Sequence, residues 1–500
     1  MDWKPDGASP EPVFQQIMRY FEQPILQGEL SPGQRLPSER ALAESLHVNR
    51  STVSMAYDEL RATGLVRSVR GQGTHVSEDA WGVVPSRVPN WHLYTTKGTF
   101  LPALPLDLRI REASTIPGII NLARSELSPD LFPVDTLQHL LRTMTVTVPL
   151  GYADPRGARS LRDVLAHHLA EQYGIPAHPD HPDQILVTTG TQQSLHLITQ
   201  CLLAPGDAVA LEGPSYAYSL SLFTSAGLRL FQIPMDAQGL QPDAVVELHR
   251  KHKVRMVFAN PTYHNPTGTT LPRERRQRLL DLCRELRLPI VEDDAYSALT
   301  LDETFTPPPA LVTMEEGSHN VIYLGSLSKT VAPGLRIGWV VGPASVIARL
   351  ADAKEQMDLG TSAIAQQLAL TLIESGAWAA NLKQLQHTLA RRRDRLIQAL
   401  TRYADDQIQW QVPRGGYHLW CNTHVQAQDA DVLEMGIRHH VLFVPGGLYG
   451  AARGHVKFSF ARATTEEIDE GIRRFVDTMR TLGASGYERS HIGADNSTGR

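Results

Sequence analysis

Seven short apolar runs, each separated from the next by a segment of helical character, lie between residues 185 and 342. The runs are ILVTT (185–189), AVALE (208–212), LRLFQI (228–233), RMVFAN (255–260), PIVEDD (289–294), VIYLGS (321–326) and RIGWVVG (336–342). Strands that are apolar throughout and alternate with helices are typical of a parallel sheet covered on both faces. We therefore predict an α/β domain with a mostly parallel seven-stranded sheet. From about Thr361 onward, strands such as GYHLWC and VKFSF between long helices indicate a smaller C-terminal lobe.

The first 76 residues follow a different order, which is helix, helix, helix and hairpin. The first helix is amphipathic, with apolar residues at helical spacing: Phe14, Ile17, Met18, Phe21, Ile25 and Leu26. Ser38 is placed to cap a second helix, ERALAESL, and Asn49 to cap a third that Gly64 ends. Two β-prone runs around a GQG turn follow in LVRSVRGQGTHV. This order predicts a helical head of the winged helix-turn-helix type.

The length of 500 residues exceeds what one hydrophobic core holds, because single cores stop growing at about 250–300 residues. We predict a head at residues 1–76, an interdomain linker at 77–117, an α/β body at 118–480 and a flexible tail at 481–500. The linker is predicted from its prolines and polar residues and its lack of periodicity.

The composition, 42% hydrophobic and 20% charged, is that of an ordinary globular protein. No run approaches the ~20 apolar residues that a membrane-spanning helix needs, and the start MDWKPDGASPEP lacks the features of a secretion signal. Cys201, Cys283 and Cys421 are far apart and without CxxC spacing, so neither a disulfide framework nor a metal site is expected. We expect a cytoplasmic protein that makes no membrane contact.

The net charge of −5 does not indicate nucleic-acid binding, so that function must be argued from local features. Six arginines and no lysine lie between residues 35 and 76. Arg50, Ser51 and Thr52 occupy the first turn of the third helix, where side chains and free N–H groups can meet phosphates and base edges. Each arginine taken alone could equally be a solvated surface charge, and acidic residues share the segment. The capping signals and the arginines together favour a DNA-binding module.

The segment from Pro32 to Val76 resembles the winged helix-turn-helix of the GntR family, with its LPSER turn, its NRSTV helix start and its wing glycines. The resemblance implies that the partner is a double-stranded DNA operator. It also implies a set of DNA-contacting residues, which are Arg35, Ser38, Arg40, Arg50, Ser51, Thr52, Arg70 and Gly71.

The body carries the residue types that pyridoxal phosphate chemistry requires, which are an imine-forming lysine, a carboxylate for the pyridine nitrogen and anchors for a phosphate. Lys329 lies in SLSKTVAPGLRIGW, seven residues before Arg336. Asp293 ends an apolar run in VEDDAYS, where open α/β sheets place ligand contacts. Gly190 and Thr191, in TTGTQQSL, lie at a strand-to-helix junction whose free N–H groups suit a phosphate. Each motif alone is a weak signal.

Residues 118–480 resemble the fold-type I aminotransferases of class I and II, whose motifs occur here in the family's order. The resemblance implies that Lys329 is the catalytic lysine and forms the internal aldimine with pyridoxal 5′-phosphate. It implies that Asp293 pairs with the pyridine nitrogen, that Tyr296 and Asn265 (in NPTG) bond the phenolic oxygen, and that Tyr216 (in GPSY) stacks on the ring.

The same resemblance implies a phosphate-binding set at Gly190, Thr191, Gln192, Ser326 and Arg336. Tyr152, in GYADPRG, would reach that phosphate from the neighbouring subunit. A site shared in this way implies a homodimer.

One position departs from the aminotransferase pattern. Where these enzymes place an arginine that holds the substrate α-carboxylate, VKFSF has Lys457, which supplies charge without the planar fork. Arg453 or Arg462 could take over that role in a shifted register, or Arg462 could be a surface charge before the next helix. Recognition of ordinary α-amino acids is therefore in doubt.

A GntR-type head, a long linker and an aminotransferase-like body together resemble the MocR subfamily of bacterial transcription regulators. That resemblance implies a regulator that senses pyridoxal phosphate, an amino-compound effector, or both, through an aldimine at Lys329. Two alternatives stay open: a working aminotransferase that carries a DNA-binding head, and a vestigial dimerisation module. The intact Lys329, Asp293 and Arg336 argue against the vestigial module.

Overall fold

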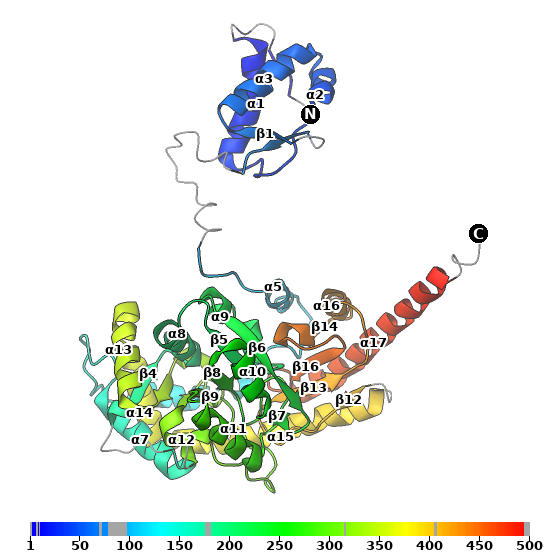
Figure 1. Cartoon of the computed structure of the whole chain (residues 1–500). Coiled ribbons are helices and arrows are strands. Elements are labelled where there is room, and N and C mark those ends of the chain that lie inside the picture. The colour runs from blue at the N-terminus through cyan, green and yellow to red at the C-terminus, as the bar shows by residue number, and fades with distance from the viewer. Residues whose placement is uncertain are drawn as a thin grey trace. The chain divides into compact units, whose positions relative to one another are not determined.

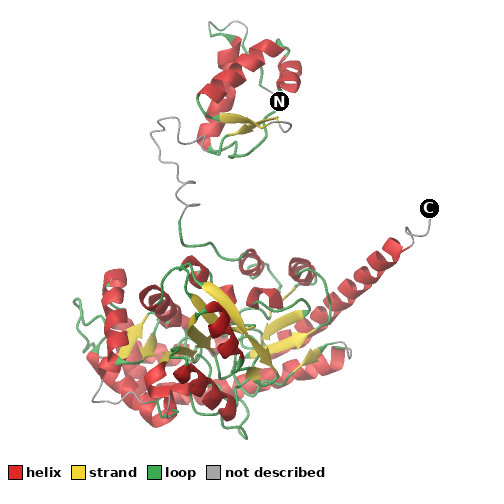
Figure 2. Cartoon of the chain, in the orientation of Figure 1, coloured by secondary structure: helices red, strands yellow, loops and turns green. Residues whose placement is uncertain are grey.

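The computed structural model describes residues 3–6, 9, 11–69, 73–78, 98–175, 182–314, 317–404 and 408–494. The chain forms two compact units, Met1–Gly98 and Thr99–Arg500, and each is described by itself. Figure 1 labels their elements, and Figure 2 shows helices and strands in both. No helix in the described ranges is long and apolar enough to cross a membrane.

The N-terminal unit has three helices and a hairpin, α1 (Val13–Gln27), α2 (Glu39–Leu46), α3 (Arg50–Ala62), β1 (Val66–Val69) and β2 (Gly73–Val76). Its core is formed by apolar residues that all three helices bury, among them Ile17, Phe21, Leu42, Val53 and Tyr57. The Ser38 hydroxyl accepts a hydrogen bond from Ala41 N at 3.2 Å, which is the predicted cap of α2. Asn49 precedes α3 as predicted but makes no side-chain cap bond. The winged helix-turn-helix prediction is confirmed.

The second unit is built on an eight-stranded sheet in the order β4-β11-β10-β9-β8-β5-β6-β7. The bounds are β4 (Ile185–Thr188), β5 (Ala208–Gly213), β6 (Arg229–Asp236), β7 (Gly239–Leu240), β8 (Val254–Ala259), β9 (Ile290–Asp293), β10 (Val321–Ser326) and β11 (Gly338–Val341). Strand β11 is antiparallel to both its neighbours and β7 to β6, whereas the others share one direction. The mostly parallel sheet is confirmed, but its strand number exceeds the predicted seven by β7, a two-residue edge strand after a turn.

Both faces of this sheet are covered by helices. The helices around it are α6 (Val134–Thr143), α7 (Arg159–Tyr173), α8 (Thr191–Leu202), α9 (Leu222–Ser225), α10 (Ala244–His252), α11 (Arg273–Glu285), α12 (Gly317–Asn320), α13 (Ala344–Asp358) and α14 (Ala363–Glu374). Along β10, Val321 and Tyr323 pack with residues of α7, α11 and α14. Ile322 and Leu324 pack on the opposite face with residues of α8 and α13. This alternation explains why consecutive residues of β10 are apolar, since both of its faces are covered.

The C-terminal lobe contains an antiparallel sheet in the order β12-β13-β16-β15. Its elements are α15 (Ala377–Tyr403), β12 (Gln409–Trp410), β13 (His418–Asn422), α16 (Asp429–Arg438), β14 (Val441–Leu442), β15 (Val444–Pro445), β16 (His455–Ser459) and α17 (Thr465–Ala494). Helix α17 extends to Ala494, although residues 481–500 were predicted to be a flexible tail. Cys283 and Cys421 are buried and Cys201 is half-buried.

The segment predicted as a linker, 77–117, contains a helix, α5 (Pro105–Ala113), which is followed by β3 (Ile120–Asn121). Ile110 and Ala113 of α5 pack in an apolar cluster with residues of α16, β14 and β15. Arg109 donates two hydrogen bonds to the Glu434 carboxylate. Strand β3 pairs in parallel with β14. The second unit therefore begins near Thr99, earlier than the predicted 118, because Pro105 starts a helix instead of marking a loop.

Candidate cofactor site and DNA-binding surface

The candidate cofactor site lies where the parallel strands of the large sheet end. Asn260 follows β8, Asp293 ends β9, and the turn after β10 carries Lys329. One cavity is lined by seven of the residues that the aminotransferase resemblance implies, namely Thr191, Gln192, Tyr216, Asn265, Asp293, Tyr296 and Lys329. The carboxyl ends of parallel strands are where open α/β sheets bind ligands.

Lys329 reaches into this cavity from a turn held by serine hydroxyls. The Ser326 hydroxyl donates to Ser328 Oγ at 2.9 Å and accepts from Ser328 N at 3.0 Å. Lys329 is half-buried, and its Nζ donates to the carbonyl oxygen of Ser125 at 3.0 Å. Desolvation lowers the pKa of Lys329, while the charge of Asp293 opposes that shift. A lowered pKa increases the fraction of uncharged amine, which is the nucleophilic form.

Asp293 is buried on the same cavity, and its two carboxylate oxygens differ. Tyr216 donates its hydroxyl hydrogen to Oδ2, whereas Oδ1 is buried without a hydrogen-bond partner. Burial raises the pKa of Asp293 to about 6. A buried carboxylate oxygen without a donor is costly, and a protonated ring nitrogen would satisfy it. Asn265 Oδ1 is a second buried atom without a partner on this cavity. The unpartnered Oδ1 of Asp293 therefore fits the protonated ring nitrogen of pyridoxal phosphate.

Asn260 connects the strand ends, and the sequence analysis missed it. Its backbone N–H donates to Glu212 Oε2 at 2.7 Å, and its amide nitrogen donates to the carbonyl oxygen of Asp293 at 2.6 Å. Its amide oxygen accepts from Asn265 N at 2.7 Å. This buried network holds Asn265 and Asp293 in fixed positions around the cavity. An asparagine directly after an apolar run, as in RMVFAN, was a usable signal for it.

Tyr296 is also held in position by two residues that do not line the cavity and that the sequence analysis missed. His418 Nε2 lies 3.0 Å from the Tyr296 hydroxyl, and the Tyr417 ring packs edge-on against Tyr296. Burial lowers the pKa of His418 well below its usual value, with the charge of Lys457 adding to the effect. His418 therefore acts as a neutral hydrogen-bonding partner of Tyr296.

The predicted phosphate contacts gather at the amino end of α8, where backbone N–H groups are free to bind an anion. Gly190 has φ +99, and a Cβ added there would lie 2.7 Å from Nη2 of Arg336. Arg336 is exposed, and its guanidinium donates to the carbonyl oxygens of Thr189 and Pro333. Ser326 is buried at the end of β10, just before the turn that carries Lys329, and does not line the cavity.

Tyr152 does not line the cofactor cavity of its own chain. Its side chain is 89% exposed, and it belongs to a different hollow that also includes Gly360. This position is compatible with a contact to a second subunit.

Of the residues considered for an effector carboxylate, Lys457 is buried in β16. Its Nζ donates to Ser125 Oγ at 2.7 Å and lies 5.3 Å from the centroid of the Tyr449 ring. Burial, with the charge of Lys329 adding to it, lowers the pKa of Lys457 to about 7. Arg462 donates to the carbonyl oxygen of Leu127 at 3.4 Å, and Arg453 is exposed. None of these three lines the cofactor cavity.

The N-terminal unit exposes part of the predicted DNA-contacting set on one pair of helices. Arg40 pairs with Glu44 at 3.0 Å on α2, and Arg50 of α3 pairs with Glu39 at 3.5 Å. Exposed pairs of this kind contribute about 0–1 kcal/mol, so a phosphate can replace the carboxylate. Ser51 is exposed and Thr52 half-buried at the start of α3.

Arg35 lies beside the wing, where its backbone bridges to His75 and its guanidinium lies next to Gly73. Ser38 is exposed, and its hydroxyl caps α2. Arg70 and Gly71 lie outside the described residues.

Comparison with known families gives two matches on this chain. The aminotransferase class I and II model matches residues 119–475, and the model of bacterial regulatory proteins of the gntR family matches residues 14–76. The chain is 37% identical over 483 residues to the uncharacterized HTH-type transcriptional regulator YisV of Bacillus subtilis, covering 96% of this chain and 98% of YisV. It is 31% identical to the 2-aminoadipate transaminase of Thermus thermophilus, covering 73% of this chain and 91% of the transaminase.

A solved structure is similar in the same region. The kynurenine aminotransferase of Pyrococcus horikoshii, in complex with PMP, is similar with a TM-score of 0.71 and 29% identity. The match covers 79% of this chain and 97% of that enzyme. The aminotransferase fold of the second unit implies pyridoxal phosphate as the cofactor, and the winged helix implies DNA binding.

Proposed function

Because the chain belongs to the MocR type of HTH-type transcription regulators, which join a GntR-family head to an aminotransferase class I and II domain, we propose that it binds an operator with its head and senses a ligand at Lys329. The ligand is pyridoxal phosphate, an amino compound that reacts with it, or both. The observation that carries this proposal is the unsatisfied Oδ1 of buried Asp293 in the cavity that Lys329 lines.

When bound, pyridoxal phosphate supplies an aldehyde that amines attack and a ring that accepts electrons. Lys329 supplies an amine whose pKa burial lowers. Asp293 holds the proton of the ring nitrogen, and its own pKa of about 6 leaves it mostly ionised at neutral pH. Tyr216 covers the ring, and Asn265 and Tyr296 donate to its phenolic oxygen.

The phosphate is bound by the free N–H groups at the start of α8, by Thr191 and Gln192, and by Arg336 once its guanidinium leaves the Thr189 carbonyl oxygen. Gly190 leaves space for that guanidinium. Ser326 supports the phosphate end from within its turn. Tyr152 completes the site in the neighbouring subunit, which makes the homodimer the functional unit.

Lys457 does not line the cavity as it stands, and we propose that it contacts the anionic group of an effector once its Nζ leaves the Ser125 hydroxyl, in place of an arginine fork. Since the pKa of Lys457 is about 7, its charge is only partly present at neutral pH. The pocket therefore favours effectors that depend on one point charge and not on two parallel hydrogen bonds. Arg462, 3.8 Å from Glu126 Oε2, is the second residue on that side.

In the head, Arg40, Arg50, Ser51 and Thr52 contact DNA with α2 and α3, and Arg35 and the wing flank the groove. An effector changes operator affinity only by the difference in its affinity for two states of the protein, typically about 1–3 kcal/mol.

The test is operator affinity, measured for the wild type and Lys329→Ala with and without pyridoxal phosphate and candidate amines. We expect a change of about 5–150-fold on adding ligand to the wild type and none for Lys329→Ala. Equal affinities under all conditions would overturn the sensor role and leave the DNA-binding head untouched. An Arg50→Ala variant is the control for specific DNA contact, and it should weaken binding in every ligand condition.

A working aminotransferase is the second candidate, favoured by the likeness to 2-aminoadipate transaminase and by Lys329 at a cavity that holds the other cofactor contacts. Multiple turnovers of transamination with an amino donor and a keto acceptor would support the enzyme. A single partial reaction would support the sensor.

A further inference from the structure

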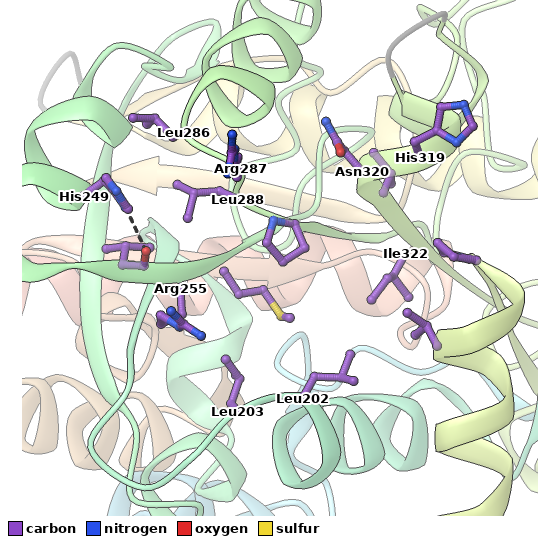
Figure 3. Close-up of a pocket in the computed structure, with 16 residues that line it drawn as sticks. Leu202, Leu203, His249, Arg255, Leu286, Arg287, Leu288, His319, Asn320 and Ile322 are labelled. Carbon is purple, nitrogen blue, oxygen red and sulfur yellow. Dashed lines mark hydrogen bonds between the residues drawn. The ribbon is translucent and has the colours of Figure 1, made fainter.

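The parallel strands β8, β9 and β10 of the second unit also border a cavity at their amino ends. Val254 starts β8, Pro289 precedes β9 and Val321 starts β10, and all three line a cavity of about 490 Å³. Figure 3 shows the residues that surround it. A volume of this size lies within the range of about 300–1,000 Å³ that is usual for small-molecule sites.

This cavity is separate from the cofactor site. The two lie at opposite ends of the same strands, and a six-residue strand such as β8 or β10 spans about 20 Å at about 3.3 Å per residue. No residue that the structure describes lines both cavities.

The interior of the cavity is apolar. Val254, Met256, Leu288, Val321 and Ile322 are buried and line it. Its remaining apolar walls come from the end of α8 and the start of α13, with Leu202, Leu203, Pro343 and Val346. These side chains offer an organic ligand an apolar surface to bury.

The rim of the cavity is cationic. Arg255 and Arg287 are both exposed and lie at separate points around the cavity, with His319 and Asn320 at a third (Figure 3). Among the described residues, no aspartate or glutamate lines the cavity. Within the part of the chain that the structure describes, neither guanidinium makes a hydrogen bond or an ion pair.

Arg287 also occupies an unusual backbone position. It follows the last turn of α11 with φ +55, in the left-handed region that favours glycine at helix ends. Glycine adopts this backbone conformation at a lower energetic cost than arginine does. The chain nevertheless has Arg287 at this position beside the cavity.

We propose that this cavity is a second ligand site, for a small organic anion with an apolar body. The apolar interior buries the body, and Arg255 and Arg287 bind a carboxylate or phosphate at the rim. Organic cations are disfavoured by the same two charges, and uncharged ligands gain no charge-assisted hydrogen bond from the guanidinium groups.

The test is calorimetric titration of the full-length protein, saturated with pyridoxal phosphate, with 4-phenylbutyrate and with its uncharged analogue 4-phenylbutanamide. Saturating the cofactor site first restricts the signal to other sites. We expect one saturable site for the carboxylate with a Kd of roughly 10 µM to 1 mM, and binding at least about tenfold weaker for the amide.

Three variants make the test specific. Arg255→Gln with Arg287→Gln should weaken 4-phenylbutyrate at least about tenfold, and Val346→Trp should abolish its binding by filling the cavity. Arg273→Gln removes an exposed arginine at the other end of α11 and should change nothing. An unchanged affinity in the double variant, equal affinity for the amide, or no saturable binding would each overturn the proposal.

Discussion

The large sheet and the small sheet of the second unit each send one lysine to the same residue, Ser125. Lys329, after β10, donates to the Ser125 carbonyl oxygen at 3.0 Å, and Lys457, on β16, donates to its hydroxyl oxygen at 2.7 Å. Desolvation lowers the pKa of both lysines. Lys329 lines a cavity with Asp293, whereas Lys457 is buried against Tyr449. The difference teaches that a lowered pKa alone does not make a lysine a cofactor ligand. Access to a cavity with a matching carboxylate is also required.

The largest expected effect separates the two lysines directly. Lys329→Ala should abolish the visible absorbance of lysine-bound pyridoxal phosphate, because no other amine in the described residues lines the cavity. Lys457→Ala should keep that absorbance. The measurement is a spectrophotometric titration of both variants. Loss of the signal in Lys457→Ala alone would contradict the claim that Lys329, and not Lys457, binds the cofactor.

The next effect removes the carboxylate that distinguishes the two environments. Asp293→Ala should weaken pyridoxal phosphate binding by roughly 30- to 5,000-fold, equivalent to about 2–5 kcal/mol for one partner of a buried charged pair. Equilibrium dialysis measures this affinity. Asp352→Ala is the control, since Asp352 is exposed, pairs with Arg349 and does not line the cavity. A loss smaller than about threefold for Asp293→Ala would show that Asp293 does not hold the ring nitrogen.

A smaller effect depends on pH and concerns Lys457. With a pKa of about 7, this lysine is charged below pH 7 and loses its charge as pH rises. The affinity for an anionic amine effector should therefore fall about tenfold between pH 6 and pH 8. Lys457→Arg should remove that pH dependence, because a guanidinium stays charged. The same slope in Lys457→Arg and wild type would assign the titration to another group.

The smallest effect uses the two oxygens of Ser125. Ser125→Ala removes the hydroxyl that Lys457 contacts and keeps the carbonyl oxygen that Lys329 contacts. We expect a loss of about 1 kcal/mol in the free energy of unfolding and an unchanged cofactor spectrum. Chemical denaturation and absorbance measure the two quantities. A changed spectrum would show that the lysines are coupled through the side chain of Ser125.

The sequence predicted the large sheet well, because its seven longer strands lie in apolar runs of five to seven residues, most of which are buried on both faces. It missed β7, a strand of two residues, Gly239–Leu240, that no periodicity can reveal. It also missed α5, because Pro105 reads as a loop residue although it stands at the first position of a helix.

The sequence found the residues that contact the cavity directly, since Asp293, Asn265 and Lys329 lie in recognisable motifs. It missed Ser125, whose carbonyl oxygen accepts a hydrogen bond from Lys329. It also missed His418, which lies within hydrogen-bond distance of the Tyr296 hydroxyl and does not line the cavity. Contacts of this kind depend on tertiary packing between segments far apart in the chain, and no local pattern encodes them.

Borohydride reduction of the protein saturated with pyridoxal phosphate, followed by peptide mass spectrometry, tests the central claim most directly. The account predicts a reduced pyridoxyl group on Lys329 and none on Lys457. A label on Lys457, or an unlabelled Lys329 in saturated protein, would contradict it.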